Sequence, residues 1–297
     1  ALVAELSAHG LPARFVPLSA FASPSLGDSD ATLVIFSQRL SPNARLALRA
    51  SPRFASTIVC TTVDDATLRE RGGAGLEVVT RRLPDLNEPP TLVRVLGPPC
   101  ATLDALRLAA QLLALAGVPP RFDDDAISAA VTALDDRADD IAAQCAAALA
   151  DYGDDEVVFV TVGGYDAWVR GIRCTWQEGL LVARPPIYDA LAFAHGPLQQ
   201  LYPRRAAIIA LGCDGDDPRV LERLRATLAP QHRFVELRSH LAAPLSVLEH
   251  DAMVGWLVHA ALQRAPRDLF QWPGKGADGP LYKLGELRDD SDGSAQA

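Results

Sequence analysis

Apolar residues in this chain gather in short runs that alternate with stretches of helical spacing. Each run is apolar for most of its length, which is typical of a parallel strand covered on both faces. The predicted strands cover 33–36, 57–61, 76–80, 93–96 and 157–162. The predicted helices are one that ends near Gly10, one that begins at Pro42, and others at 101–117, 125–150 and about 244–264. This alternation predicts an α/β fold with a mainly parallel sheet.

A polar turn follows the run at 33–36 and leads into a helix. Ser41 is a favourable N-cap residue and Pro42 suits the first helical position, so the helix is predicted to begin there. Free amides at such a helix start, with the side chains of Ser37 and Gln38, can bind an anion at the carboxyl end of the strand. The alternative is an ordinary capped turn without a ligand.

The pattern of the first half returns in the second half. The segment 11–21 is echoed at 183–193, and Phe21 and Phe193 are 172 positions apart. The strand and helix start around Ser37 are echoed around Gly212, which lies 175 positions later. A nearly constant offset predicts two copies of one α/β unit. The second copy opens with the strand 157–162 and a Gly-Gly turn at 163–164, whereas the first copy lacks such a leading strand.

The length and composition of the chain are compatible with two domains. A chain of 297 residues with 49% hydrophobic content can form two domains. We expect a first domain over 1–120, connecting helices over 121–153, and a second domain with a C-terminal tail over 154–287. The segment 288–297 contains no large apolar residue and is predicted to be disordered.

Charge and cysteine content limit the partners. A net charge of −9 argues against nucleic acid or an anionic membrane as the main partner, while one local phosphate site stays compatible with it. No stretch is apolar enough to span a bilayer, and a signal-peptide pattern is missing, so a cytoplasmic protein is expected. The five cysteines are scattered, and the histidines show no metal-ligand spacing, so neither disulfides nor a metal are expected.

Several motifs together resemble the double sugar isomerase (SIS) proteins. They are "SQ" after a strand at 37–38, a strand ending in a glycine turn at 163, a helix with Gln177-Glu178, and "HGP" at 195–197. The 17-residue step from Glu178 to His195 is the most specific of them. The resemblance extends from residue 1 to about 287 and is closest to the isomerase half of glucosamine-6-phosphate synthase and related deglycases and isomerases. It implies two three-layer α/β/α domains with mainly parallel sheets, the first without its leading strand.

The resemblance implies that Ser37, Gln38 and Ser41 bind the phosphate of a sugar phosphate. The family usually has Ser-Gln-Ser-Gly-(Glu or Arg)-Thr in this turn, whereas this chain has Ser-Gln-Arg-Leu-Ser-Pro at 37–42. A hydroxyl and a glycine are therefore lost, which makes a close backbone approach to phosphate less favourable. Arg39 can supply a forked, charge-assisted contact in their place; the alternative is a solvent-exposed loop arginine.

Glu178 resembles the family's proton shuttle between C1 and C2 of an open-chain sugar. This chemistry needs a carboxyl group whose pKa is raised by an apolar pocket, for which Trp176, Leu180 and Leu181 are the expected walls. The alternative is an exposed helix glutamate. The residue three positions earlier, often lysine in the synthase, is Thr175.

The same resemblance suggests three further site residues. His195 corresponds to the ring-opening histidine, which in the family acts in the neighbouring subunit, so a homodimer is implied. Lys283, in a "D-x-P…K" pattern from Asp278, corresponds to the lysine that contacts the sugar carbonyl and can form an imine, with Lys275 as the rival candidate. Thr102 falls where the family has a Ser-Thr pair near the sugar; helix N-capping is the alternative.

The expected function is therefore phosphosugar chemistry through an enediol: aldose–ketose isomerisation, or deamination or deglycation of an amino-sugar phosphate. No metal or redox cofactor is expected, because hydrogen-bond donors can stabilise an enediol. This sequence contains no glutaminase domain, so glutamine-dependent synthesis by this polypeptide is not expected. The alternative is a non-catalytic sugar-phosphate sensor or partner subunit.

Overall fold

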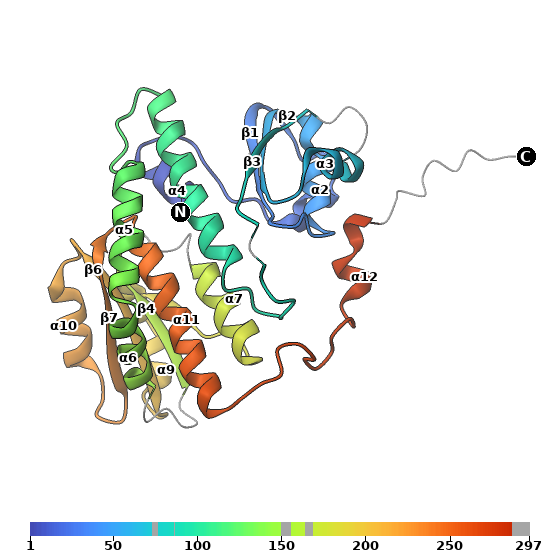
Figure 1. Cartoon of the computed structure of the whole chain (residues 1–297). Coiled ribbons are helices and arrows are strands. Elements are labelled where there is room, and N and C mark those ends of the chain that lie inside the picture. Colours follow the sequence, from blue (N-terminus) through green and yellow to red (C-terminus); the bar gives the residue numbers. More distant parts are fainter. Residues whose placement is uncertain (73–76, 86, 150–155, 164–168, 287–297) are drawn as a thin grey trace, which may run out of the picture. The chain divides into compact units, whose positions relative to one another are not determined.

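The computed structural model describes residues 1–72, 77–85, 87–149, 156–163 and 169–286. The predicted turn residue Gly164, the predicted boundary at 153–154 and the predicted tail at 288–297 lie outside these residues. The chain forms two compact units (Figure 1). We call Ala1–Ala13 with Glu88–Trp272 the larger unit, and Arg14–Asn87 with the segment from Pro273 the smaller unit. The predicted domain limits at 120 and 153 stay a prediction.

A four-stranded parallel sheet forms the centre of the larger unit, and its strand order is β5-β4-β6-β7. Phe159 of β4 pairs with Ile187 on one side and with Ile209 on the other, which fixes the register. The strands are β4 (Glu156–Thr161), β5 (Ile187–Asp189), β6 (Ala206–Asp214) and β7 (Arg233–Ala242).

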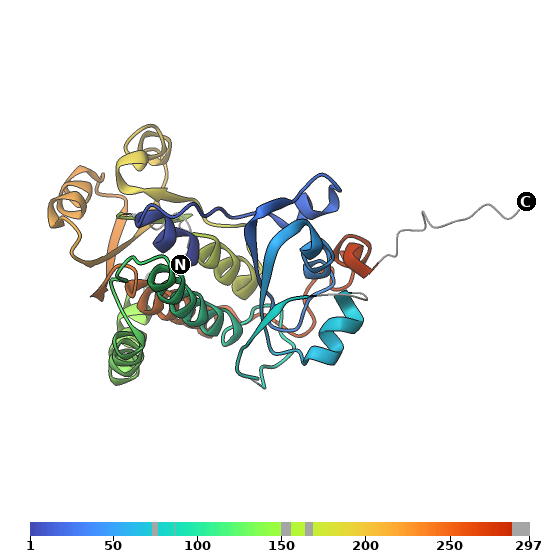
Figure 2. The same cartoon turned by 90° about the horizontal axis from the view of Figure 1, so that it is seen from above.

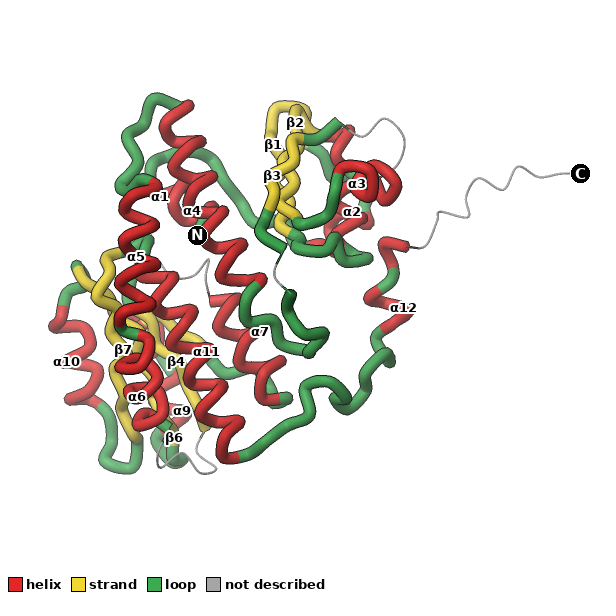
Figure 3. The backbone as a smooth tube through the Cα atoms, in the orientation of Figure 1, coloured by secondary structure: helices red, strands yellow, loops and turns green. Residues whose placement is uncertain are grey.

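Both faces of this sheet are covered by helices, because successive residues of β4 and β6 point to opposite sides. Val157 and Phe159 lie in one hydrophobic cluster, while Val158 and Val160 lie in another. Figures 2 and 3 show the helices of this unit on either side of the strands. Helices α6 (Ala138–Ala148), α7 (Val169–Leu180) and α11 (Ser246–Arg264) contribute to the first cluster, and α8 (Ala190–Phe193), α9 (Pro197–Leu201) and α10 (Pro218–Thr227) to the second. The predicted three-layer α/β/α arrangement is confirmed.

Two details of the predicted helical region are wrong. The predicted helix 125–150 is divided at Arg137 into α5 (Asp124–Asp136) and α6, and the Asp123 carboxylate caps α5. The run 93–96 is not a strand but part of the loop that leads into α4 (Gly97–Leu115). A short apolar run cannot by itself separate a strand from another buried segment. Helix α1 (Leu2–Ala8) packs on α4.

The smaller unit contains a three-stranded parallel sheet of order β1-β2-β3. Phe21, Leu33, Leu48 and Leu68 form its buried cluster with their neighbours. Among the described strands β1 pairs only with β2, whereas β6 lies between two strands, as expected for a first copy without its leading strand. Its elements are β1 (Asp28–Phe36), β2 (Phe54–Thr61), β3 (Val79–Arg82), η1 (Leu18–Ala22), α2 (Ala44–Arg49), η2 (Ser51–Arg53), α3 (Asp65–Gly72), α12 (Gly279–Tyr282) and η4 (Leu284–Glu286).

The predicted internal repeat has a structural basis. Phe21 and Phe193 are both buried, and each stands in a short helical turn that precedes a strand, β1 or β6. After those strands, Leu40 and Gly215 take the same place in the repeat, and both have left-handed backbone angles, with φ of 52° and 92°. The turn geometry therefore persists even where glycine is replaced.

The predicted helix start at Ser41-Pro42 is wrong, because α2 begins at Ala44 and Asn43 precedes it. The Ser37 hydroxyl accepts the Ser41 amide at 3.1 Å, so the backbone makes a further turn before the helix. Leu40 within this turn is 1% exposed. Burial of its side chain, worth roughly 1.5–3 kcal/mol, offsets the ~1–2 kcal/mol cost of a left-handed non-glycine residue.

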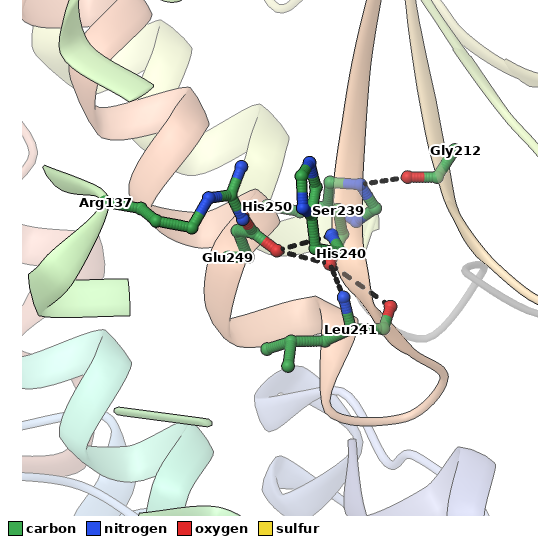
Figure 4. Close-up of polar contacts among 7 residues, drawn as sticks. All are labelled: Arg137, Gly212, Ser239, His240, Leu241, Glu249 and His250. Carbon is green, nitrogen blue, oxygen red and sulfur yellow. Dashed lines mark hydrogen bonds and ion pairs between the residues drawn. The ribbon is translucent and has the colours of Figure 1, made fainter. Parts of the chain in front are cut away.

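A buried carboxylate joins three elements of the larger unit (Figure 4). Glu249 accepts hydrogen bonds from the Ser239 hydroxyl at 2.7 Å and the His240 amide at 2.8 Å, and it forms an ion pair with Arg137. The neighbouring His250 donates from Nε2 to the Gly212 carbonyl at 2.8 Å. These contacts fix the start of α6, the end of β7 and the first turns of α11 at the carboxyl edge of the sheet.

Candidate functional site

The loop at 37–43, which we call the phosphate loop after the role that the sequence predicts for it, lies at the carboxyl end of β1 and is held by the next strand. The Gln38 carbonyl accepts the hydroxyls of Thr61 and Thr62 at 3.0 and 2.7 Å, and the Thr62 amide at 2.9 Å. The Arg71 guanidinium donates to the Arg39 carbonyl at 3.0 Å. The backbone of this loop is therefore held at Gln38 and Arg39 by hydrogen bonds from its neighbours.

The side chains of the phosphate loop differ in what they offer to an anion. The Ser37 hydroxyl accepts the Ser41 amide, so an anion that takes this amide must replace the hydroxyl as its acceptor. Arg39 is exposed, which fits both a phosphate contact and a solvated loop arginine. Because α2 has only six residues and begins after Asn43, the helix contributes less to anion binding than the sequence predicted.

The corresponding turn after β6 is unsuited to an anion. There the Asp216 carboxylate accepts the Cys213 amide at 2.7 Å, and the Asp217 carboxylate accepts the Arg219 amide at 3.0 Å. Hydrogen bonds from Arg219 hold the pKa of Asp217 down at about 2, so this carboxyl is charged. Two internal carboxylates thus take the role that an anion could have, whereas the first of the two related turns has no carboxylate at 37–43.

Lys283 belongs to the same unit as the phosphate loop. It directly follows α12 and lies on a hollow of about 470 Å³. Lys275, the rival candidate, is exposed and does not line this hollow. The structure therefore brings Lys283 and the phosphate loop into one unit through the contacts of α2 described below. The hollow is lined by Gly276, Asp278, Gly279, Pro280, Tyr282 and Lys283.

Glu178 lies in the last turns of α7, in the larger unit, and it is only partly exposed. Burial raises the pKa of its carboxyl group, and the nearby Arg94 guanidinium partly counteracts this rise. A glutamate on an open helix surface has no such shift, so the alternative of an exposed surface residue does not fit. A partly buried carboxyl with a raised pKa has the properties of a general base or acid.

The predicted apolar walls around Glu178 are wrong in two cases. Trp176 is 2% exposed and packs edge-on against Phe159, with ring centroids 5.4 Å apart, and Leu180 lies in the same core cluster. Residues two apart on a helix point in nearly opposite directions, so Trp176 turns away from the carboxylate. Leu181 ends the helix with a left-handed backbone, φ 55°.

Arg94 is a candidate site residue that the sequence did not indicate. It lies in the loop before α4, which the sequence predicted as a strand. The buried Glu88 carboxylate orders this loop by accepting the amides of Leu96 at 2.8 Å and Gly97 at 3.4 Å, and Arg94 itself donates to the Pro89 carbonyl. In the synthase a lysine often stands at the position of Thr175, on the same helix as Glu178. In this chain the cation near Glu178 is Arg94, which comes from the loop before α4.

Replacing Arg94 with glutamine is expected to raise the pKa of Glu178 further, because a positive charge that lowers the pKa of that carboxyl is removed. Carboxyl ¹³C chemical shifts followed from pH 3 to 8 measure this directly and need no substrate. The matched control is Arg184→Gln, an exposed arginine just after α7, which should leave the titration unchanged. An unchanged midpoint in Arg94→Gln would contradict the electrostatic pairing.

The other predicted residues of the larger unit occupy two separate segments. Thr102 is the sixth residue of α4 and is partly buried, so the alternative of an N-cap is wrong. His195 is exposed in the turn between α8 and α9. Gln199 holds this turn by accepting the Gly196 amide at 2.9 Å and donating to the Ala194 carbonyl at 3.2 Å. Joining these residues and Glu178 with the phosphate loop in one site is a proposal.

The described residues contain neither a group of metal ligands nor a helix that could span a membrane. No group of three or more His, Cys, Asp or Glu side chains in that part of the chain is arranged to hold a metal ion. Within the same residues, no helix has the length and apolar character that crossing a membrane requires.

Comparison with solved structures identifies the fold. The chain is similar to the C-terminal domain of glucosamine-fructose-6-phosphate aminotransferase from Francisella tularensis, with a TM-score of 0.65, 15% identity, and coverage of 91% of this chain and 82% of that one. It has the double SIS fold. Glucosamine-6-phosphate deaminase from Thermotoga maritima matches with a TM-score of 0.62 and 14% identity, over 89% of this chain and 80% of that one. Tagatose-6-phosphate ketose/aldose isomerase from Escherichia coli matches with 0.58, 13% and 91% and 82%.

Two other comparisons found no match for this chain. No protein-family model matches the sequence, and no curated protein matches it. At 13–15% identity the structural likeness concerns the fold. The predicted resemblance is thus confirmed as a fold.

Proposed function

We propose that this protein binds a sugar phosphate and interconverts its aldose and ketose forms through an enediol. The observation that carries the proposal is Glu178, a partly buried carboxyl group with a raised pKa on a helix of a double SIS fold. In the scheme, Glu178 removes the proton from C2 of the open-chain aldose while O1 takes a proton from water, which gives the enediol. The same carboxyl returns the proton to C1, and the hydroxyl proton on O2 goes back to water as the C2 carbonyl forms.

The other residues bind and prepare the substrate. Ser37, Gln38 and Ser41 hold the phosphate with neutral donors, and Arg39 adds a charge-assisted contact from its exposed position. Hydrogen-bond donors stabilise the enediol oxygen, so the scheme uses no metal or redox cofactor.

Three further roles complete the site. His195 opens the sugar ring and acts from the partner subunit of a homodimer. Its turn is exposed and is held by two hydrogen bonds of Gln199, as such a role requires. We expect this homodimer to be cytoplasmic. Lys283 engages the substrate carbonyl, and Thr102 contacts the sugar. Deamination or deglycation of an amino-sugar phosphate is a variant of this scheme, in which the same carboxyl moves the proton through an enolamine, the nitrogen counterpart of the enediol. The imine that results takes up one water and releases ammonia or an amine.

A non-catalytic sugar-phosphate sensor or partner subunit is the second candidate. It is favoured by the phosphate loop, where the buried Leu40 adopts the left-handed backbone that suits glycine and the Ser37 hydroxyl is already bonded to the Ser41 amide. These features lower the adaptability of the loop without removing its donors. A sensor would bind the phosphate but would not exchange protons of the sugar.

Solvent exchange separates the two candidates. Fructose 6-phosphate incubated with the protein in D₂O is expected to incorporate deuterium at C1 or C2, which ¹H and ¹³C NMR detect. Fructose without phosphate is the control and should remain unlabelled. A rise in melting temperature without deuterium incorporation would support the sensor. Neither effect with fructose 6-phosphate, glucosamine 6-phosphate or tagatose 6-phosphate would reject both candidates.

A further inference from the structure

The C-terminal segment of the smaller unit is attached to the start of α2 by a single amide side chain. Asn43 donates from Nδ2 to the Leu281 carbonyl at 3.1 Å and accepts the Gly285 amide on Oδ1 at 3.3 Å. These contacts lie two residues before and two residues after Lys283. One side chain, about 240 positions away in sequence, therefore fixes the backbone on both sides of the lysine.

Two further contacts hold the same segment. Arg45 on α2 forms an ion pair with Glu286 at 3.2 Å. Gly285 packs so tightly that a Cβ atom there would lie 1.9 Å from the Pro42 carbonyl oxygen, which no side chain can occupy. The segment thus rests directly on the backbone of the phosphate loop, and the loop cannot shift at Pro42 without displacing it.

We propose that Asn43 is a positioning residue that couples occupancy of the phosphate loop to the placement of Lys283. The proposal rests on the proposed function, in which the loop binds phosphate and Lys283 engages the carbonyl. Asn43 follows Ser41-Pro42 directly, so an anion that reorganises this turn acts on the side chain that holds Lys283. The role requires a donor and an acceptor on one short side chain. Aspartate keeps only the acceptor, and alanine keeps neither.

The test uses the full chain with fructose 6-phosphate and sodium borohydride. The Lys283 amine attacks the sugar carbonyl and one water leaves, which gives an imine. Borohydride adds hydride to the imine carbon, and the nitrogen takes a proton from water, so a stable secondary amine forms that peptide mass spectrometry locates. Asn43→Ala is expected to slow this labelling at least tenfold, and Asn43→Asp to slow it less. Fructose 6-phosphate binding, measured by the melting-temperature shift, should stay close to wild type in both.

Two more variants separate positioning from general support. Gly285→Ala forces the segment away from Pro42 and is expected to reproduce the Asn43→Ala result from the opposite side of the contact. Arg45→Gln removes the ion pair but leaves both Asn43 bonds, and labelling should be nearly unchanged. Wild-type labelling rates in Asn43→Ala or Gly285→Ala would overturn the proposal.

Amide hydrogen exchange distinguishes failure of this inference from failure of the proposed function. Bound fructose 6-phosphate is expected to slow exchange at residues 281–286 in the wild type but not in Asn43→Ala. If the wild type gives no labelled Lys283 while this ligand effect persists, the coupling stands and the catalytic role of Lys283 fails. If exchange at 281–286 does not respond to the ligand in the wild type, the coupling itself is absent.

Discussion

Replacing Glu178 with glutamine is expected to lower turnover of the sugar phosphate by about 10³-fold, the usual contribution of a positioned general base. Glutamine has the same shape as glutamate but does not take up the C2 proton. Binding should change little, because in the proposed site the phosphate is held by side chains of the phosphate loop. Deuterium incorporation from D₂O measures the proton transfer, and the ligand-induced rise in melting temperature measures binding.

The neighbouring Gln177 supplies the matched control, since it is exposed on the same helix and Gln177→Ala should keep wild-type turnover.

A second experiment addresses the proposed homodimer. Mixing Glu178→Gln with His195→Ala should restore part of the activity, because each mixed dimer would contain one site with both native residues. Turnover that survives in Glu178→Gln would show that another group moves the proton.

The fold was predictable where the chain is apolar on both faces of a strand. The runs that became β4 and β6 have no polar face, and only a sheet covered on both sides accommodates such a pattern. The run at 93–96 is apolar at three of its four positions, yet it is a loop in which the Glu88 carboxylate accepts the Leu96 amide. Local pattern does not reveal a hydrogen-bond partner of this kind.

The helix start at Ser41-Pro42 failed for a related reason. Its residues are favourable for an N-cap, but the preceding Leu40 is drawn into the core with a left-handed backbone, and Ser37 then captures the Ser41 amide. The gain from burying one leucine exceeds the value of a cap, which is typically about 1 kcal/mol.

The candidate site likewise contains a residue that the sequence indicated and two residues that it did not. Glu178 was found through its 17-residue spacing to His195, a local signal carried by the resemblance. Asn43 and Arg94 carry no such signal, because their importance depends on contacts with residues far along the chain, up to 242 positions for Asn43. Residues that position or tune others are therefore the part of the site that only coordinates provide.

The second large effect expected concerns stability against pH, and it arises from two adjacent groups of α11, the buried His250 and the partly buried Asp251. Burial lowers the pKa of His250 to about 4, and burial raises the pKa of Asp251 to about 6. The unfolded histidine takes up its proton near pH 6.5, so the His250 contribution falls by about 3 kcal/mol as the pH drops from 6.5 to 4. The folded aspartate takes up its proton first, so the Asp251 contribution rises by a similar amount between pH 6 and 3.8.

These opposite contributions should nearly cancel in the wild type, and Asp251→Asn should separate them. At pH 7.5 the variant is expected to be about 3 kcal/mol more stable, since it no longer holds a charged carboxylate in this poorly solvated position. That gain should vanish by pH 4, which leaves a steep loss of stability on acidification. Urea unfolding followed by tryptophan fluorescence suits the measurement, because all four tryptophans belong to the larger unit.

The controls for this prediction lie in the same unit. Glu222→Gln, at an exposed position of α10, should leave the profile unchanged. His250→Gln keeps a donor for the Gly212 carbonyl but cannot be protonated, so its stability should rise as the pH falls from 6 to 4. Because the two variants are expected to slope in opposite directions, a common response would contradict the assignment of these groups. A parallel shift of both profiles would instead mean that the replacements alter packing rather than proton uptake.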